Sequence, residues 1–496
     1  MKRVSILLSA TAAVLLLAVA CVVQESPITG KERAYAYSWD EEVRIGDQTD
    51  DEIVAQYGVY ESEELSEYVN RISQDVLAVS HMRRETTAEK FRNTEFTFRV
   101  LDSPVVNAFA LPGGYVYVTR GLVSHLNNEA QIAMVLGHEI GHVAARHASQ
   151  RGLTQTIGQV AVLGGAILGQ ELLGIPGQSL LNLSSQAAQL LFLSYSRDHE
   201  RESDQLGVEY SAKAGYASAE GAEFFTSLKR ISERSGQSLP NFLSTHPDPG
   251  EREETIPEKA QYWKEQGFEQ SIFNTEEYMS HINGIIYGEN PRQGFRRDNQ
   301  FYHPDLEFQF PIPANWQMVN QASRVALVSP ESEAITVFSI DSESETAQGS
   351  VESFLTSNEI ENAARRAMTS SGRWNAYQAV FDAQSENQQL RVLLYAVEYG
   401  GNIYRFLNYS SRSQYDTFEP LFQQTTGKFD ALRDPEIVNI QPVRLSVFRA
   451  ERSAPFTDFL PAELPMNIEP EEVAIINQLE LEDRVEEGRY IKIPTQ

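Results

Sequence analysis

The chain has 496 residues, of which 41% are hydrophobic and 22% are charged, so it is long enough and apolar enough to form more than one hydrophobic core. Its formal net charge is −28 at pH 7, and a surface of that sign repels the phosphate backbone of nucleic acids. We therefore expect no nucleic-acid partner.

Residues 1–20 have the order of a secretory signal peptide, because two basic residues precede an apolar run that ends just before Cys21. Cys21 is the only cysteine in the sequence, which excludes an internal disulfide. The stretch "LAVAC" resembles a bacterial lipobox, although Leu17 stands one position further from the cysteine than in the usual pattern. The resemblance implies that Cys21 is lipidated and, because Val22 follows it in place of aspartate, that the protein is sorted to the outer membrane. A plain signal peptide and an uncleaved anchor are the alternatives.

The next part of the chain is interpreted as a tether over residues 22–38, where the sequence shows no periodicity. Helical periodicity follows in residues 38–58 and 61–80. Two short strands are predicted at 95–101 and 114–120, because apolar and polar residues alternate there and a Pro-Gly-Gly turn lies between them.

A helix with a chemical motif is predicted to begin near Asn128, a residue type that caps helices well. This helix contains "HEIGH", with His138 and His142 four positions apart and therefore one above the other on the same face. Two imidazoles so placed are able to bind one Zn²⁺, and Glu139 then lies beside the open coordination position, where it can accept a proton from water. An ordinary solvated helix that happens to carry histidines is the alternative.

A third metal ligand is predicted in "YSRDHERESDQLG". Glu200 and Asp204 stand four positions apart on one helical face, so Glu200 is placed to reach the metal while Asp204 accepts a hydrogen bond from a ligand imidazole. Glu202 is the rival ligand, and a charged surface helix is the alternative to both. His147 lies five positions after His142, off the ligand face, and is interpreted as structural.

Four segments occur in the order that one peptidase family has: "NAFALPGGYVYVTRGLV", "HEIGHVAARH", "YSRDHERESD" and "STHPDPGER". Together they resemble the gluzincin-type family that contains the CAAX prenyl proteases, HtpX and the periplasmic BepA-like enzymes, over about residues 38–260. The resemblance implies one Zn²⁺ per chain, with Glu139 as general base and Asp204 as a supporting carboxylate that is also described as a proton donor. The implied zinc ligands are His138, His142 and Glu200.

The strand segment before the motif helix suggests where substrate binds. A strand beside the zinc helix is able to pair main chain to main chain with an extended peptide, and Asn107 and Ala108 are the residues expected to contact it. A plain sheet edge without a binding role is the alternative.

His246, in "LSTHPDPGER", allows three functional or structural readings. It packs locally against Pro247, or stabilises the oxyanion of the reaction, or occupies the fourth position on zinc and holds the enzyme silent. The last is our hypothesis.

The rest of the chain changes character twice. Residues 157–173 are apolar and glycine-rich, too short and polar for a membrane span, and are interpreted as core or as a mobile flap over the site. Strand-like runs dominate residues 300–410 and predict an antiparallel sheet, which a helix over 351–368 interrupts. The opening of this region, "FYHPDLEFQFPIPANW", loosely resembles the PsbP-like fold.

The last sixty residues resemble the second half of a LysM module, with a helix ending at Asn477, a loop containing Gly488 and a strand over 490–493. The first half of that module is not recognisable, which leaves glycan binding open. The fold class is therefore α+β multidomain: a mainly helical HExxH zinc-peptidase domain with a small sheet, then an antiparallel-sheet α+β domain and a small LysM-like module. The predicted units are a signal peptide (1–20), a tether (21–38), a zinc metallopeptidase domain (39–285), the α+β domain (286–435) and the LysM-like module (436–496).

These observations predict a periplasmic zinc metalloendopeptidase, lipid-anchored to the outer membrane, that cleaves unfolded or mis-assembled envelope proteins. Its partners would be protein or peptide substrates, the membrane, and peptidoglycan or envelope-assembly proteins through the C-terminal modules. Membrane-embedded relatives have several spanning helices and BepA-like enzymes have helical repeats, neither of which this sequence shows, so partner recognition does not transfer. A non-proteolytic assembly factor and a cell-wall-binding lipoprotein are the alternatives.

Overall fold

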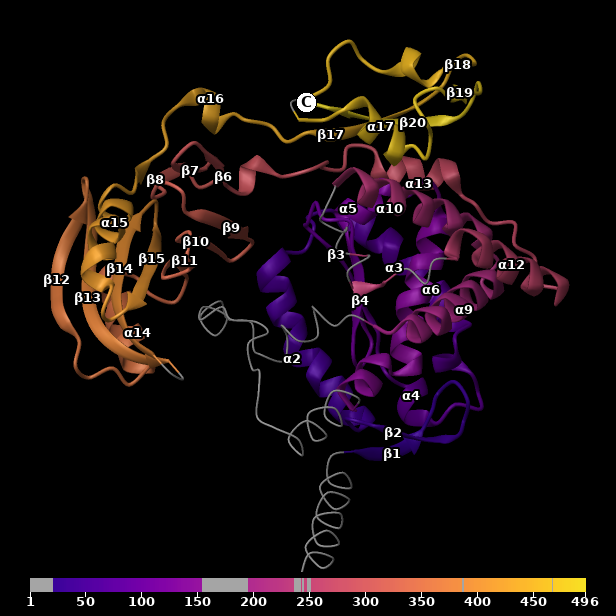
Figure 1. The fold of residues 1–496 in the computed structure, drawn as a ribbon, viewed down its shortest axis with the longest axis horizontal. Coiled ribbons are helices and arrows are strands. Elements are labelled where there is room, and N and C mark those ends of the chain that lie inside the picture. The colour runs from indigo at the N-terminus through magenta and orange to yellow at the C-terminus, as the bar shows by residue number, and fades with distance from the viewer. Residues whose placement is uncertain are drawn as a thin grey trace, which may run out of the picture.

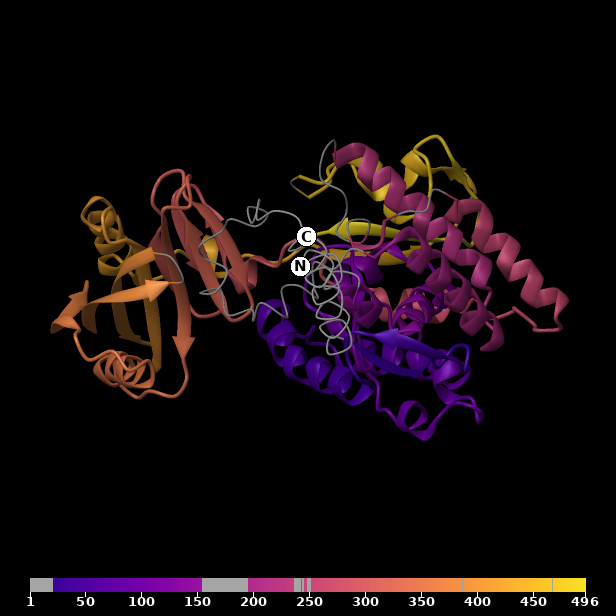
Figure 2. The ribbon, with the colours of Figure 1, turned by 60° about the horizontal axis from the view of Figure 1, so that its bottom comes forward.

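The computed structural model describes residues 21–153, 195–235, 242, 245–247, 251–385, 388–465 and 467–496. A helical body contains most of the first 285 residues, and a curved sheet lies to one side of it in both views of the ribbon (Figures 1 and 2). The C-terminal strands return to the helical body (Figure 1). The residues predicted as a flap, 157–173, lie outside the described residues.

The helical body is built from long helices around a three-stranded sheet. Its helices are α2 (Trp39–Tyr57), α3 (Glu63–Ala78), α4 (Glu89–Arg92), α5 (Arg120–His125), α6 (Glu129–Ala145), α9 (Arg197–Lys213), α10 (Gly221–Ser235), α12 (Arg252–Glu265) and α13 (Thr275–Ile282), with short 3₁₀ turns at His81–Arg83 and Ser218–Glu220. Its sheet has the order β3 (Thr97–Leu101), β5 (Tyr115–Thr119), β4 (Ala108–Leu111), with β3 parallel and β4 antiparallel to β5. The predicted helices and strands of this region are confirmed.

Capping residues account for the ends of the first two helices. The Ser38 side chain accepts a hydrogen bond from the Glu41 N–H at the start of α2, and Ser62 does the same for Leu65 at the start of α3. Gly58 ends α2 with a φ of 71°, a backbone conformation that favours glycine.

The segment expected to be a tether has regular structure. Strands β1 (Val22–Glu25) and β2 (Glu32–Tyr35) form an antiparallel hairpin, and Tyr35 is fully buried. Arg146, at the C-terminal end of α6, donates to Gln24 Oε1 and to the Tyr37 carbonyl, which fastens this hairpin to the helical body. Strands of four residues are too short to show a two-residue alternation clearly, which explains why the sequence gave no signal.

The sheet-rich region has two small helices and a seven-stranded antiparallel sheet of order β12-β13-β14-β15-β11-β10-β9. The strands are β9 (Gln317–Gln321), β10 (Arg324–Val328), β11 (Ala334–Asp341), β12 (Ala364–Ser371), β13 (Trp374–Ser385), β14 (Gln388–Tyr399) and β15 (Asn402–Ser411), and the helices are α14 (Ala347–Ser357) and α15 (Tyr415–Gly427). A second sheet has the order β16 (Asp430–Ala431), β8 (Phe308–Pro311), β7 (Gln300–His303), β6 (Phe295–Arg297), with a 3₁₀ turn at Pro291–Gln293 before it. The α+β fold class is confirmed in these coarse terms.

The helix predicted over 351–368 was wrong in its second half. Helix α14 ends at Ser357, Glu359 has a φ of 56° in the left-handed region, and the chain then enters the edge strand β12. Most residues of this edge strand are exposed, so no apolar alternation marks it as a strand in the sequence.

The C-terminal residues share a hydrophobic core with the helical body. The elements here are α16 (Pro435–Val438), β17 (Arg444–Arg449), β18 (Ala454–Pro455), a 3₁₀ turn (Phe456–Phe459), α17 (Pro470–Ile476), β19 (Arg484–Val485) and β20 (Tyr490–Thr495). Strands β17 and β20 pair antiparallel, and Val473, Ile476 and Ile491 lie in the same cluster as the apolar residues of α6. The predicted helix, loop and strand are present, and the LysM-like assignment stays a prediction.

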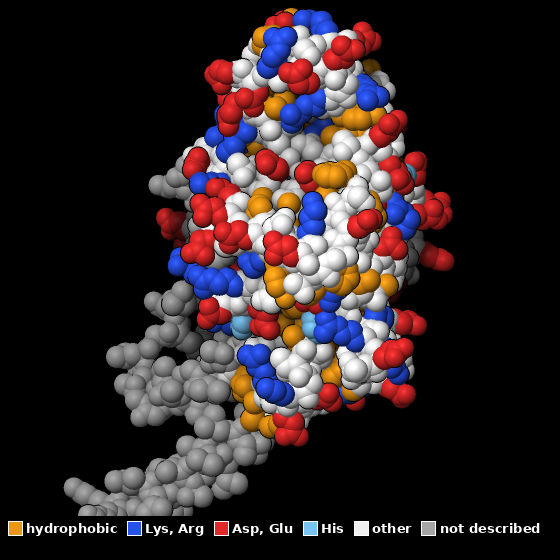
Figure 3. Space-filling model, turned by 90° about the vertical axis from the view of Figure 1, so that its right-hand side faces the viewer, with side chains coloured by type: hydrophobic (Ala, Val, Ile, Leu, Met, Phe, Trp, Pro, Cys, Tyr) orange, Lys and Arg blue, Asp and Glu red, His pale blue; other side chains and the backbone are white. Residues whose placement is uncertain are grey.

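The surface of the molecule is charged. On the face shown in Figure 3, acidic and basic side chains are interspersed and apolar side chains lie between them in small groups. Within the described part of the chain, every helix is too short or too polar to cross a membrane.

Candidate metal centre

Helices α6 and α9 approach each other closely because each has a glycine at the contact. A Cβ on Gly207 would lie 2.8 Å from the His138 backbone nitrogen, and a Cβ on Gly137 would lie 2.9 Å from the Gly207 carbonyl oxygen. No side chain larger than hydrogen fits there without moving one helix. This contact places the first two turns of α9 directly beside the motif of α6.

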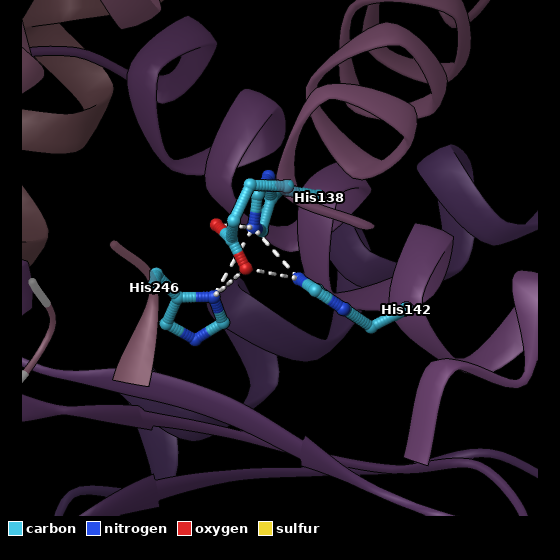
Figure 4. A group of neighbouring side chains, drawn as sticks. His138, His142 and His246 are labelled. Atoms are coloured by element: carbon cyan, nitrogen blue, oxygen red, sulfur yellow. Dashed lines mark hydrogen bonds and ion pairs between the residues drawn. The ribbon is translucent and has the colours of Figure 1, made fainter. Parts of the chain in front are cut away.

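Four buried side chains converge at this contact: His138 and His142 from α6, Glu200 from α9, and His246 from the segment after α10 (Figure 4). Their ligand atoms all lie within 4.8 Å of one another. His138 Nε2 is 3.0 Å from His142 Nε2 and 3.3 Å from His246 Nδ1. Glu200 Oε1 is 3.5 Å from His142 Nε2 and 3.3 Å from His246 Nδ1. The lone pairs of these atoms therefore face a common point.

The donor set fits Zn²⁺. Imidazole nitrogens and a carboxylate oxygen are the ligands that zinc takes in proteins, and its sites are commonly four-coordinate. All four side chains are at most 2% exposed, and polar groups at that depth need either hydrogen bonds or a cation. Glu200 Oε1 has no hydrogen-bond partner within the part of the chain that the structure describes, and a metal ion bound by the group would satisfy it.

A buried arginine holds the two acidic residues of α9 in place. Arg252, the first residue of α12, donates from Nη2 to Glu200 Oε2 at 2.5 Å and from Nε to Asp204 Oδ2 at 2.8 Å. Asp204 Oδ1 in turn lies 2.9 Å from His138 Nδ1. Burial alone would raise the pKa of Asp204, but the Arg252 charge and the His138 contact outweigh it and hold that pKa below its usual value.

Glu139 differs from these carboxylates. Among the described residues neither of its oxygens has a hydrogen-bond partner, and His246 Nε2 is 3.7 Å from Oε1. Burial raises the pKa of Glu139 above its usual value. A buried carboxylate with free lone pairs and a raised pKa is suited to accept a proton.

Glu202, the rival ligand, and His147, interpreted as structural, lie next to each other, and His147 contacts His142. His147 Nδ1 is 3.0 Å from His142 Nδ1, and His147 Nε2 is 3.1 Å from Glu202 Oε2. Glu202 is therefore not in the group of four ligand atoms. Burial lowers the pKa of His147, which favours its neutral form.

The structure adds two residues that the sequence did not single out. Arg252 lies in the quoted "STHPDPGER" segment but its role follows only from the packing of α12 on α9. The Tyr195 ring stacks on His142 with centroids 4.0 Å apart, and its backbone N–H donates to the Thr245 carbonyl next to His246. Both are long-range contacts, which a spacing pattern does not reveal.

The residues predicted to bind substrate lie in and before β4, the edge strand that packs beside α6. The Asn107 N–H donates to Thr119 Oγ1, and the Asn107 carbonyl accepts from the Thr119 N–H. Ala108 is fully buried. These two residues are not part of the group of four, as expected for a neighbouring strand.

Comparison with known proteins gives the same region a family. Residues 68–260 match Peptidase family M48, which confirms the resemblance drawn from the motifs. The mitochondrial metalloendopeptidase OMA1 of Arabidopsis thaliana is 36% identical over 157 residues, covering 32% of this chain and 30% of that protein. A putative beta-barrel assembly-enhancing protease of Vibrio cholerae is 31% identical over 192 residues, covering 38% of this chain and 37% of that protein. The match thus spans about a third of each relative.

The sheet-rich region has a weaker likeness. The solution structure of cyanobacterial PsbP from Synechocystis is 12% identical, with a TM-score of 0.23, and covers 27% of this chain and 91% of that one. A likeness at this TM-score carries no conclusion about this chain.

Proposed function

We propose that this protein is a zinc metalloendopeptidase of the bacterial cell envelope. The observation that carries the proposal is the buried convergence of His138, His142 and Glu200 beside the unpaired carboxylate of Glu139. The match of residues 68–260 to Peptidase family M48 supports the same reading.

In the proposed reaction His138, His142 and Glu200 hold the ion. When bound, Zn²⁺ would polarise the scissile carbonyl and lower the pKa of a water molecule to about 7. Glu139 takes the proton of the attacking water and delivers it to the leaving amine. Asp204, held by Arg252, fixes His138 with its proton on Nδ1 so that Nε2 keeps its lone pair for the metal.

Substrate would bind as an extended strand. Among the described residues, strand β4 is an edge strand of its sheet and pairs only with β5, so its other side would accept main-chain hydrogen bonds from a peptide. We assign Asn107 and Ala108 to this contact, because they lie where β4 begins, next to the motif helix.

His246 is proposed as a fourth, regulatory ligand. Its Nδ1 faces the same point as the other three ligands, and its Nε2 is directed at Glu139. The ring therefore stands where water and the scissile carbonyl must meet, which would hold the enzyme silent. The His246→Ala variant should cleave faster than the wild type; slower cleavage would instead give His246 a catalytic role.

The substrates are proposed to be unfolded or mis-assembled envelope proteins in the periplasm; the Vibrio cholerae relative is named a putative beta-barrel assembly-enhancing protease. Lipidation of Cys21 would attach the chain to the outer membrane. Because β1 begins at Val22, such an anchor would hold the helical body against the membrane surface. Peptidoglycan contact through the LysM-like residues belongs to the same proposal.

The test compares casein cleavage by the wild type and by Glu139→Gln, with the zinc content of both proteins measured. Glutamine keeps the size of the side chain but accepts no proton, so we expect cleavage to fall about 10²–10⁴-fold while zinc content stays at one per chain. Equal, residual cleavage by both proteins, persisting when the comparison is repeated in the His246→Ala background, would favour a non-proteolytic assembly factor. A protein that contains no zinc and stays inert after zinc is added would end the proposal.

A further inference from the structure

The two ligand histidines of α6 are supported differently on the side that faces away from the metal point. His138 Nδ1 meets a carboxylate directly, Asp204 Oδ1, at 2.9 Å. His142 Nδ1 meets a second imidazole, His147 Nδ1, at 3.0 Å. His147 Nε2 then reaches Glu202 Oε2 at 3.1 Å, and the Glu202 side chain is 36% exposed. A chain of three groups thus leads from the ligand to the protein surface.

The positions of the protons in this chain follow from its outer end. An ionised carboxylate only accepts hydrogen bonds, so Glu202 requires the proton of His147 on Nε2. The Nδ1 of a neutral His147 then has a lone pair and accepts from His142 Nδ1–H. With its proton on Nδ1, His142 has a free lone pair on Nε2, the atom that faces Glu200 and His138.

We propose that His147 and Glu202 are positioning residues that set the tautomer and the ring orientation of His142 for metal binding. This inference rests on the proposed zinc site and deepens it. Supporting groups of this kind raise the affinity of a ligand for its metal, and their loss typically weakens metal binding 10–100-fold.

Two neighbours restrain His147. The Ser203 hydroxyl lies 3.3 Å from His147 Nδ1, farther than His142 Nδ1 at 3.0 Å, so His142 has the shorter contact with the single lone pair of that nitrogen. The His199 ring stacks on His147, with centroids 4.3 Å apart and an interplanar angle of 18°. The imidazole is thereby held in the plane that serves both of its hydrogen bonds.

The test measures the zinc dissociation constant of the full-length protein by competition with a chromophoric chelator at one fixed pH. His147→Phe keeps an aromatic ring of similar size but has no acceptor, and we expect its zinc binding to be about 10–100-fold weaker. His147→Asn loses the ring but offers Oδ1 close to the former Nδ1, so it should bind zinc within a few-fold of the wild type, an order-of-magnitude expectation from restored acceptance.

These two variants separate positioning from packing. If His147 only fills space, phenylalanine should be the better substitute and asparagine the worse, which is the reverse of the expected order and would overturn the proposal. Wild-type-like zinc binding by His147→Phe would overturn it as well, while leaving the zinc peptidase intact. A wild type that binds no zinc would remove the proposed function and this inference together.

A second pair of variants, at Glu202, controls for a folding defect caused by substituting the buried His147. Glu202 is partly exposed, so Glu202→Leu and Glu202→Gln should both fold, which thermal unfolding of the metal-free proteins will check. Glutamine still accepts from His147 Nε2–H, whereas leucine does not. Weaker zinc binding by the leucine variant than by the glutamine variant supports the chain of hydrogen bonds, and equal binding by the two contradicts it.

Discussion

The helical body buries ionisable side chains in two places, and the two arrangements differ. At the metal centre, Arg252 contacts Glu200 and Asp204, so opposite charges lie together beside the ligand atoms. In the C-terminal strand β20, the fully buried Lys492 Nζ donates to the carbonyls of Ser124 at 2.9 Å and Leu126 at 2.8 Å. No carboxylate contacts it within the described residues.

The difference between these two arrangements distinguishes a binding site from a structural contact. The metal centre has more acceptors than its own donors satisfy, as a binding site for a cation requires. The Lys492 contact is complete in itself, since it covers carbonyls at the end of α5 and in the loop before α6 with the last strand of the chain. The first arrangement has ligand atoms left over for a cation, and the second attaches the C-terminal strand to the end of α5 and the loop before the motif helix α6.

The largest effect is expected from removing the positive charge of Arg252 at the metal centre. Arg252→Met leaves Glu200 and Asp204 buried without a counter-charge, and removing one partner of a buried ion pair typically costs about 3–5 kcal/mol of folding free energy. Urea unfolding of the metal-free protein measures it. The matched control is Arg44→Met, which removes an exposed pair with Glu41 and should change stability little, because water screens exposed ion pairs. Equal losses in the two variants would show that Arg252 is not held as a buried charge.

The next effect tests the close approach of α6 and α9. Gly207→Ala places a methyl group 2.8 Å from the His138 backbone, where no flexible side chain can give way, and overpacking of this kind costs about 1–3 kcal/mol. Because the strain falls on the ligand helix, zinc affinity should fall as well. Gly427→Ala at the end of α15, in the sheet-rich region, meets nothing within 4 Å and is the control. Zinc titration measures the affinity, and thermal unfolding measures the stability, of both variants.

The sequence predicted the parts of the site that depend on local spacing. His138, Glu139 and His142 follow from one helical turn, and Glu200 with Asp204 from another, because residues four apart share a helical face. The contacts of His147 with Glu202 and of Arg252 with α9 join segments about 50 residues apart in the chain, and no spacing rule reports on such pairs. Spacing alone therefore allows Glu202 as a metal ligand and gives no role to Arg252.

The fold shows the same division. Long amphipathic helices and alternating strands are predictable from the sequence. The hairpin at 22–35 and the edge strand β12 are not, because most of their residues are exposed and their sequences show no regular apolar alternation. The attachment of the C-terminal residues to the helical body depends on Lys492 and on the pair formed by Gln131 and Gln478, polar residues that a sequence analysis assigns to the surface. Lys492 and Gln131 are buried and Gln478 is half-buried, which follows only from the assembled structure.

The last prediction tests whether the Lys492 contact differs from an ion pair. Burial lowers the pKa of Lys492 well below its ordinary value near 10.5. Between these two pKa values the unfolded chain binds a proton that the folded chain does not, so stability rises with pH. Burial also lowers the pKa of the neighbouring His125 to about 4, so that histidine stays neutral above pH 7.

From pH 7 to pH 10 the unfolding free energy of the wild type should therefore rise relative to that of Lys492→Met, by up to about 1.4 kcal/mol per pH unit. Denaturant unfolding of the two proteins at matched pH values measures this difference. Parallel curves of unfolding free energy against pH would mean that the folded protein keeps the charge on Lys492. Lys492 would then be a buried cation held by the carbonyl dipoles of Ser124 and Leu126. In that case the Lys492 contact and the metal centre would both stabilise a buried charge through the polar groups around it.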